Sequence, residues 1–323
     1  MCTAVYTGGL FGRTLDLEYS LNEEIVLTPR RYNFDFLYAP RATEHYAIIG
    51  TAHVSGNTPL YYDGINEAGV GVAALNFPGC ATYHEPRDNG YNIASFELIP
   101  WILSRCESVD SAEKLLSDTT ITDDSFSVAL SSTPLHWMIA DRNRAITVES
   151  TENGLQIHRN EVGVMTNSPF FDYHMTKLSE YMHLDAKNSD NSLCRGVNLT
   201  AYSRGMGAIG LPGDWSSSSR FVRAVYALNH TESGGGVEDK ISKFFHIMDT
   251  VSVPDSCVKT DEGINVRTVY TSCGDLSLGE YYYTTYGCRR IACVGIRDFS
   301  LDGNKLVRVK MNGKEDIYRE MKK

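Results

Sequence analysis

The sequence predicts an α+β fold in which helices and mostly antiparallel sheets pack in layers. Strand-like stretches dominate the 323-residue chain and gather towards both of its ends, while helix-like stretches lie in pairs between them. A doubly wound fold would instead alternate strands and helices along the whole chain. Because no internal repeat or long linker interrupts the pattern, we expect a single domain over residues 1–323.

Strands are expected where β-branched and aromatic residues alternate with polar ones. Gly8-Gly9 separates the first two such stretches and is typical of a tight hairpin turn. Residues 66–69 separate a second pair in the same way. The predicted strands cover residues 3–6, 11–17, 25–28, 46–52, 60–63, 70–77, 126–130, 137–141, 145–149, 163–166, 266–272, 281–286 and 291–296.

Helices form a smaller set, marked by apolar residues three and four positions apart. The stretch 94–105 has this period, but Pro100 inside it should kink or split the helix. Ser108 is placed to cap a helix over residues 109–116. The other predicted helices cover residues 173–183, 220–228 and 237–251.

Composition restricts the class of partner. The formal net charge of −10 argues against a nucleic-acid surface and against docking on anionic lipid. A run of about 18 apolar residues, which a membrane span needs, is not found. Residues 2–20 do not resemble a signal peptide, so we expect a cytoplasmic protein whose eight cysteines are reduced thiols.

Three common functional patterns do not fit the chain. Residues 205–210 match G-x-G-x-x-G, but no buried strand precedes them and Pro212 would break the helix that must follow. We therefore interpret them as a glycine-rich loop and expect no dinucleotide or other cofactor. The histidines and cysteines lack the spacing of a metal site, and the G-x-S-x-G pattern of serine hydrolases is not found.

The N-terminus carries the most reactive chemistry in the sequence. Removal of Met1 would give Cys2 both a thiol and a free α-amine, a nucleophile and a base on one carbon. An α-amine has a reference pKa of about 8, so a useful fraction can take the thiol proton at pH 7. Arg13 would favour a thiolate and Asp16 would orient the amine, if the hairpin brings both beside Cys2. From the residues alone, the favoured interpretation is that both are solvated hairpin charges.

Several longer motifs follow the N-terminus in a fixed order. They are GRTLD at 12–16, NEAGVGVAALNFPG at 66–79, LHWMIAD at 135–141, GVMTNSPFFDYH at 163–174, GLPGDWSSSSRFVR at 210–223 and YTSC at 270–273. Together they make the chain resemble, over essentially its whole length, the choloylglycine hydrolase family, which contains bile salt hydrolases and penicillin V acylases. The resemblance implies the N-terminal nucleophile hydrolase fold, a four-layer αββα sandwich of two antiparallel sheets flanked by helices, and commonly a homotetramer.

The resemblance also implies the residues of a thiol active site. Cys2 would be the nucleophile, with its own freed α-amine as the base. Arg13 and Asp16 fall on the family's G-R-x-x-D positions, beside the thiol and the amine. The expected reaction is attack on an amide, a thioester intermediate and its hydrolysis.

Further positions would bind the substrate. Asn76 and Asn167 match the asparagines that stabilise the oxyanion and position the substrate, and Arg220 matches a distal active-site arginine. The residues that fall near the family's apolar pocket are Leu15, Leu130 and Leu135.

The substrate implied by the resemblance is a conjugated bile salt, whose amide joins a steroid acid to glycine or taurine. Asn76 favours this over penicillin V acylase, in which the position is typically tyrosine. Ser203-Arg204-Gly205 matches a loop pattern associated with taurine conjugates, because Arg204 could reach the outer sulfonate. A binding or scaffold protein with an incidental Cys2 is the alternative of another class.

Overall fold

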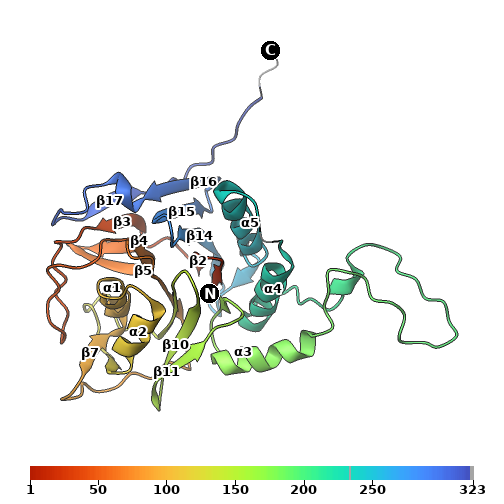
Figure 1. The fold of residues 1–323 in the computed structure, drawn as a ribbon, viewed down its shortest axis with the longest axis horizontal. Helices are drawn as coiled ribbons and strands as arrows, with labels where there is room; N and C mark the ends of the chain where they lie inside the picture. The colour runs from red at the N-terminus through yellow and green to blue at the C-terminus, as the bar shows by residue number, and fades with distance from the viewer. Residues whose placement is uncertain (233, 321–323) are drawn as a thin grey trace.

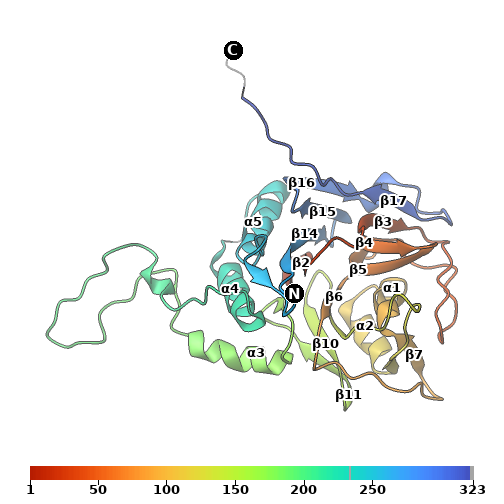
Figure 2. The ribbon, with the colours of Figure 1, turned by 180° about the vertical axis from the view of Figure 1, so that it is seen from behind.

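Two large antiparallel sheets lie face to face at the centre of the molecule, and helices cover the outer face of each (Figure 1, Figure 2). The computed structural model describes residues 1–232 and 234–320. Three buried clusters, one between the sheets and one under each helix layer, hold these layers together. The predicted α+β class and the αββα sandwich are therefore confirmed.

The first sheet has seven strands and contains the N-terminal hairpin. Gly8-Gly9 joins β1 (Cys2–Thr7) to β2 (Leu10–Leu17), and its φ values of 54° and 85° fit the predicted tight turn. Because β1 lies between β2 and β12 (Val164–Met165), the start of the chain is held inside the sheet. The remaining strands are β14 (Asn265–Asp275), β15 (Glu280–Thr285), β16 (Cys288–Gly295) and β13 (Val258–Lys259), which pairs with β14.

The second sheet has eight strands and supplies the opposite wall of the central layer. Its order is β11 (Gly154–Arg159), β10 (Ala145–Thr151), β9 (Leu135–Ala140), β6 (Gly71–Asn76), β5 (Thr58–Asn66), β4 (Ile48–Ser55), β3 (Glu24–Thr28) and β17 (Val307–Lys310). A separate parallel pair is formed by β7 (Tyr91–Ala94) and β8 (Thr119–Thr122).

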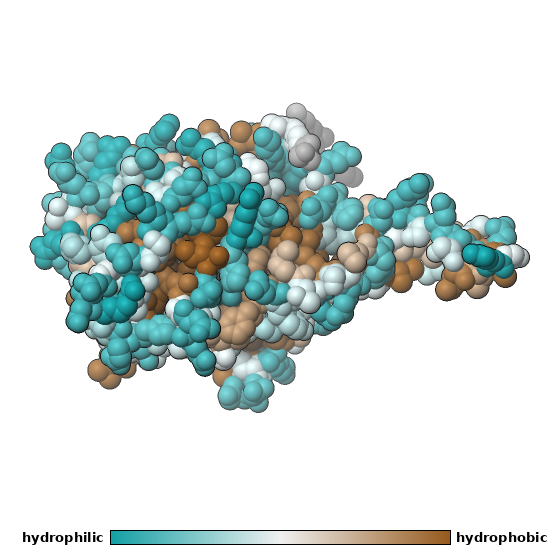
Figure 3. All heavy atoms as spheres, turned by 60° about the horizontal axis from the view of Figure 1, so that its bottom comes forward, coloured by the Kyte–Doolittle hydropathy of each residue, from teal (hydrophilic) through white to brown (hydrophobic). Residues whose placement is uncertain are grey.

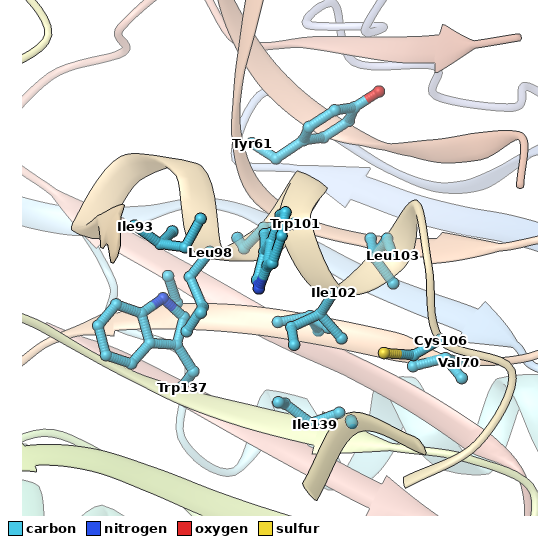
Figure 4. Close-up of a cluster of buried hydrophobic side chains, with 14 of the residues drawn as sticks. Tyr61, Val70, Ile93, Leu98, Trp101, Ile102, Leu103, Cys106, Trp137 and Ile139 are labelled. Atoms are coloured by element: carbon cyan, nitrogen blue, oxygen red, sulfur yellow. The ribbon is translucent and has the colours of Figure 1, made fainter. Parts of the chain in front are cut away.

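Helices α1 (Leu98–Leu103) and α2 (Val109–Leu116) cover the eight-stranded sheet. Figure 4 shows Trp101 and Ile102 of α1 above Trp137 and Ile139 of β9 in the buried cluster that joins them. Burial of such side chains contributes about 1.5–3 kcal/mol each relative to their exposure, so this cluster is a main source of stability for this half.

Helices α4 (Ser217–His230) and α5 (Val237–Asp249) cover the seven-stranded sheet. Phe221 of α4 and Phe244 of α5 lie in one buried cluster with Val5 of β1 and Val164 of β12. α3 (Phe171–Leu178) follows β12 directly, so the chain passes from the sheet into a helix close to the first strand.

Side-chain alternation along the hairpin decides which residues reach the layer between the sheets. Cys2 lies opposite Leu15, and Arg13 shares the face of Leu15 because it is two positions away. Cys2 and Leu15 belong to the buried cluster between the sheets. Thr3 and Asp16 therefore point to the other face, towards α4.

The structure confirms most predicted elements and corrects others. Ser108 caps α2 as predicted, because its hydroxyl accepts the N–H of Ser111. The predicted helix over residues 94–105 is shorter than expected and is not split at Pro100: a 3₁₀ turn covers Ser95–Glu97, and Pro100 lies within the first turn of α1. The predicted strand over residues 126–130 is wrong: a single bridge joins Ser127 to Leu130 around an exposed turn that has no sheet to pack against. The strands β7, β8, β11, β13 and β17 were not predicted.

We predict that Gly12→Ala prevents close pairing of β2 with β14. An added Cβ would lie 2.0 Å from the carbonyl oxygen of Ser272, a backbone atom that cannot move aside. We expect a loss of on the order of 3 kcal/mol in the free energy of unfolding, measured by urea denaturation. Gly213→Ala is the control, since nothing lies within 4 Å of its added Cβ, and it should stay within about 0.5 kcal/mol of wild type. Equal losses in the two variants would contradict the prediction.

Candidate active site

A pocket of about 310 Å³ opens over the start of β1. Cys2 and Arg13 lie in its wall, and most of the remaining lining is apolar. Such a pocket, with few polar groups at one end, is the usual form of a small-molecule site. Its apolar and aromatic lining is Leu15, Leu17, Leu21, Leu60, Tyr61, Tyr62, Ala74, Phe96, Phe126, Leu130 and Leu135.

The Cys2 thiol lies against a buried cation. Arg13 Nη2 is 2.6 Å from Cys2 Sγ, and both residues are almost fully buried. The other guanidinium donors reach backbone carbonyls, with Arg13 Nε 3.1 Å from Thr14 O and Nη1 3.2 Å from Tyr62 O. Nη1 also donates to Ala74 O. The guanidinium is thus held in direct contact with the thiol sulfur by its bonds to three backbone carbonyl groups.

The buried Asp63 side chain stabilises the positive charge of Arg13. Asp63 accepts the hydroxyls of Tyr270 and Tyr281 at 2.5 Å and that of Ser272 at 2.8 Å. Burial by itself lowers the pKa of Arg13, but the charges of Cys2, Tyr270 and Asp63 outweigh burial and raise it. The guanidinium therefore keeps its charge beside the thiol.

The nitrogen of Cys2 points away from Arg13 towards a buried asparagine. Cys2 N donates to Asn167 Oδ1 at 2.8 Å, and Arg220 Nη2 donates to the same oxygen at 2.7 Å. Arg220 Nη1 also donates to Thr3 Oγ1 at 2.7 Å and to Cys2 O. Asn167 Nδ2 donates to Asn76 O at 2.7 Å. Asn167 thus connects the Cys2 nitrogen to Asn76 at the pocket.

Met1 and Asp16 continue the hairpin beyond Cys2. The Met1 amine donates to Asp16 O at 2.7 Å, and Asp16 N donates to Met1 O at 3.0 Å. The Asp16 carboxylate accepts the hydroxyls of Thr268 at 2.7 Å and Thr14 at 3.2 Å. With Met1 in place the Cys2 nitrogen is an amide, and Asp16 holds the preceding residue through its main chain.

Most of the predicted site residues come together. Those in the pocket wall are Cys2, Arg13, Leu15, Asn76, Leu130 and Leu135. Those buried beneath it, around the first strand, are Asp16, Asn167 and Arg220.

The predicted selectivity loop does not join them. Ser203, Arg204 and Gly205 are exposed on a segment that projects from the body beyond α3 and α4, and they do not line the pocket of Cys2 (Figure 1, Figure 3). Asn188 Nδ2 donates to Ser203 O at 2.7 Å within the same segment. Within one chain, Arg204 therefore has no access to a ligand beside Cys2.

Sequence reasoning missed part of the wall. His53 lies on β4, whereas Phe96 and Phe126 lie outside the two large sheets, and all three line the pocket. The rings of Phe96 and Phe126 pack edge to face in the pocket wall, with centroids 5.4 Å apart and planes at 87°. Local motifs do not reveal these residues, because the topology brings together segments that are distant in the sequence. Thr3 could have been found, since alternation places it on the face opposite Cys2.

Neither a candidate metal site nor a candidate membrane-spanning helix is found in the part of the chain that the structure describes. Within residues 1–232 and 234–320, no group of three or more histidine, cysteine, aspartate or glutamate side chains has a geometry that could hold a metal ion. In the same part of the chain no helix has the length and apolar character that a membrane crossing requires.

Comparison with known proteins agrees with this architecture and pocket. The family model described as linear amide C–N hydrolases, choloylglycine hydrolase family, matches residues 2–309. A bile salt hydrolase/transferase of Lactiplantibacillus plantarum is 39% identical over 321 residues, which cover 98% of this chain and 99% of that protein.

Solved structures give the same result. A mutant of the conjugated bile acid hydrolase from Clostridium perfringens superposes with a TM-score of 0.91 at 33% identity, covering 99% of both chains. The penicillin V acylase of Agrobacterium tumefaciens shares the fold, with a TM-score of 0.76 at 19% identity and coverage of 96% of this chain and 91% of that one. The chain belongs to the choloylglycine hydrolase family of linear amide C–N hydrolases.

Proposed function

We propose that the chain hydrolyses the amide bond of glycine- or taurine-conjugated bile salts through a thioester on Cys2. The observation that carries this proposal is the Cys2 thiol held 2.6 Å from Arg13 in the wall of an apolar pocket. The names of the Lactiplantibacillus plantarum and Clostridium perfringens relatives support the substrate class. The apolar wall suits a steroid, because burying it there removes apolar surface from water.

The first half of the reaction forms the thioester. After removal of Met1, the neutral α-amine of Cys2 takes the thiol proton while sulfur attacks the amide carbon. The carbonyl oxygen becomes an oxyanion, and the exposed side-chain amide of Asn76 is the proposed donor to it. Collapse of this intermediate breaks the C–N bond, and the α-ammonium returns the proton to the departing glycine or taurine nitrogen.

The second half releases the acid. Water enters the position of the departed amine and gives one proton to the α-amine as its oxygen attacks the thioester carbon. The tetrahedral intermediate then expels the Cys2 sulfur, which is reprotonated, and the free bile acid leaves. Asn167 Oδ1 lies 2.8 Å from the Cys2 nitrogen, so it holds the base in place in both halves.

Two alternatives are weaker. The penicillin V acylase neighbour is similar in fold only, and position 76 is asparagine in this chain. A non-catalytic binding protein would not need a cation buried against the thiol, because a buried charge is costly unless it is paired.

We predict that Cys2→Ser abolishes turnover of glycocholate and taurocholate while the melting temperature stays unchanged, because a hydroxyl is a much weaker nucleophile. Release of glycine or taurine measures the rate, and penicillin V serves as the comparison substrate. Intact-mass analysis should show active enzyme that begins at Cys2. Active protein that retains Met1, or a serine variant with near-normal turnover, would refute the mechanism.

We predict that substitution of Asn167 lowers stability whereas substitution of Asn76 does not. Asn167→Ala leaves buried hydrogen-bonding partners of Cys2 and Arg220 unpaired, so it should lower the free energy of unfolding by about 2 kcal/mol as well as kcat. Asn76→Ala removes an exposed amide, so kcat should fall by roughly 10²-fold with an unchanged melting temperature. Thermal unfolding and steady-state kinetics on both variants test this; unchanged kcat in Asn76→Ala would remove its proposed role.

We propose that taurine conjugates are preferred only in a homotetramer, in which a neighbouring copy brings Arg204 to the pocket. The support is the resemblance of the loop and its projection from the body (Figure 3). A Ser203→Gly/Arg204→Gln variant should then lower the taurocholate-to-glycocholate ratio of kcat/KM by about tenfold. Light scattering gives the oligomeric state. A monomeric wild type, or an unchanged ratio in the variant, would contradict the proposal.

A further inference from the structure

The segment that carries Asn167 is held by side chains that the proposed reaction does not use. It leaves β12 at Met165 and enters α3 at Phe171. Asn167 lies on this short connection, outside regular structure, yet its side chain must meet both Cys2 N and Arg220. Hydrogen bonds from elsewhere must therefore fix its backbone.

Two histidines hold successive carbonyl groups of this segment. His136 Nε2 is 2.7 Å from Thr166 O, and His174 Nε2 is 2.9 Å from Asn167 O. Since a carbonyl oxygen only accepts, both Nε2 atoms carry the proton. Asn167 N in turn donates to Ser217 Oγ at 3.0 Å. Both polar groups of the Asn167 backbone are thus engaged by side chains.

Packing fixes the two imidazole rings. His136 stacks on Phe77 with centroids 4.1 Å apart and planes at 8°, and His174 stacks on Phe221 at 4.9 Å and 21°. Both histidines are 2% exposed, so neither ring can turn towards solvent without breaking its contacts. Burial lowers the pKa of His174, which keeps that ring neutral with its single proton on Nε2.

A buried glutamate holds the far end of the same segment. Glu149 Oε1 accepts Phe171 N at 2.9 Å and lies 3.6 Å from His136 Nδ1, while Oε2 lies 3.5 Å from His158 Nε2. Burial raises the pKa of Glu149, but the nearby imidazoles of His136 and His158 and the N–H of Phe171 outweigh burial and lower the pKa to about 2. The acceptor for Phe171 therefore stays ionised at neutral pH.

We propose that His136 and His174 are positioning residues for the reaction at Cys2, acting through the backbone of Thr166 and Asn167. Each donates one N–H that fixes where the Asn167 amide stands relative to the Cys2 nitrogen. Loss of the His136 donor removes the hydrogen bond to Thr166 O, and loss of the His174 donor leaves Asn167 O with only the Ser217 hydroxyl, 2.8 Å away. Small displacements of a positioning group cost rate rather than binding. The proposal rests on the proposed function only for its kinetic readout.

His174→Phe is the first test. Phenylalanine keeps the stacking on Phe221 and removes the donor, so kcat for a conjugated bile salt should fall roughly 10-fold to 100-fold with KM within about twofold. His174→Gln presents an N–H at a reach similar to Nε2 and should restore most of kcat. His174→Asn has the same amide on a shorter side chain and should not. The matching trio at His136 repeats the test.

His84→Phe is the matched control. His84 Nε2 also donates to a backbone carbonyl, Thr151 O at 2.8 Å, but it does not line the pocket of Cys2. This variant should lose stability without losing kcat. Hydrogen exchange of the peptide spanning residues 164–171 gives a readout independent of activity, and it should speed up in His174→Phe and not in His84→Phe.

The outcomes separate the two proposals. A wild type inactive on every conjugate tested refutes the proposed function, while faster exchange in His174→Phe alone still supports the positioning role. An active wild type with His174→Phe within about twofold in kcat refutes the positioning role. So does a loss of kcat that glutamine restores no better than asparagine, because the role would then be filling of space. If the phenylalanine variants do not fold, the glutamine and asparagine pair decides alone.

Discussion

The buried guanidinium of Arg13 is the contact on which the site and the joining of the two sheets depend. A cation taken out of water needs a full set of acceptors, or its burial is strongly unfavourable. Arg13 finds them on its own strand at Thr14 O and on the facing sheet at Tyr62 O and Ala74 O. The same group that faces the thiol therefore fixes how the two sheets stand against each other.

A second arginine holds the opposite face of the first strand. Arg220 comes from α4 and reaches Cys2 O, Thr3 Oγ1 and Asn167 Oδ1. Alternation puts the Cys2 side chain between the sheets and Thr3 towards the helices. Arg13 therefore contacts the start of β1 on one face, at Cys2 Sγ, and Arg220 contacts it on the other, at Cys2 O and Thr3 Oγ1. Cys2 is thus positioned by packed secondary structure rather than by a loop. The proposed reaction requires such a rigid position, because the thiol would have to meet the substrate at a fixed distance.

Features set by near neighbours in the sequence could be predicted from it. The Gly8-Gly9 turn and the Ser108 cap follow from spacing and residue type alone. The partners of Arg220 could not, since its contact with Cys2 O joins residues 218 positions apart. The position of the loop around Ser203 could not be predicted for a related reason: its residues match a selectivity pattern, but a local pattern carries no information about where a projecting segment lies.

Under the proposed mechanism, the place of Met1 separates folding from activation. Met1 adds one more pair of hydrogen bonds to the hairpin through Asp16 and lies in the wall of the pocket. The chain that retains Met1 therefore already has the hairpin, the contacts of both arginines and the Asn167 contact. In the proposed reaction, the change that removal of Met1 would bring is chemical: an amide nitrogen would become a basic amine, and the volume of one residue would be vacated beside it. The proposed mechanism thus requires no difference in architecture between the chain that begins at Met1 and the chain that begins at Cys2.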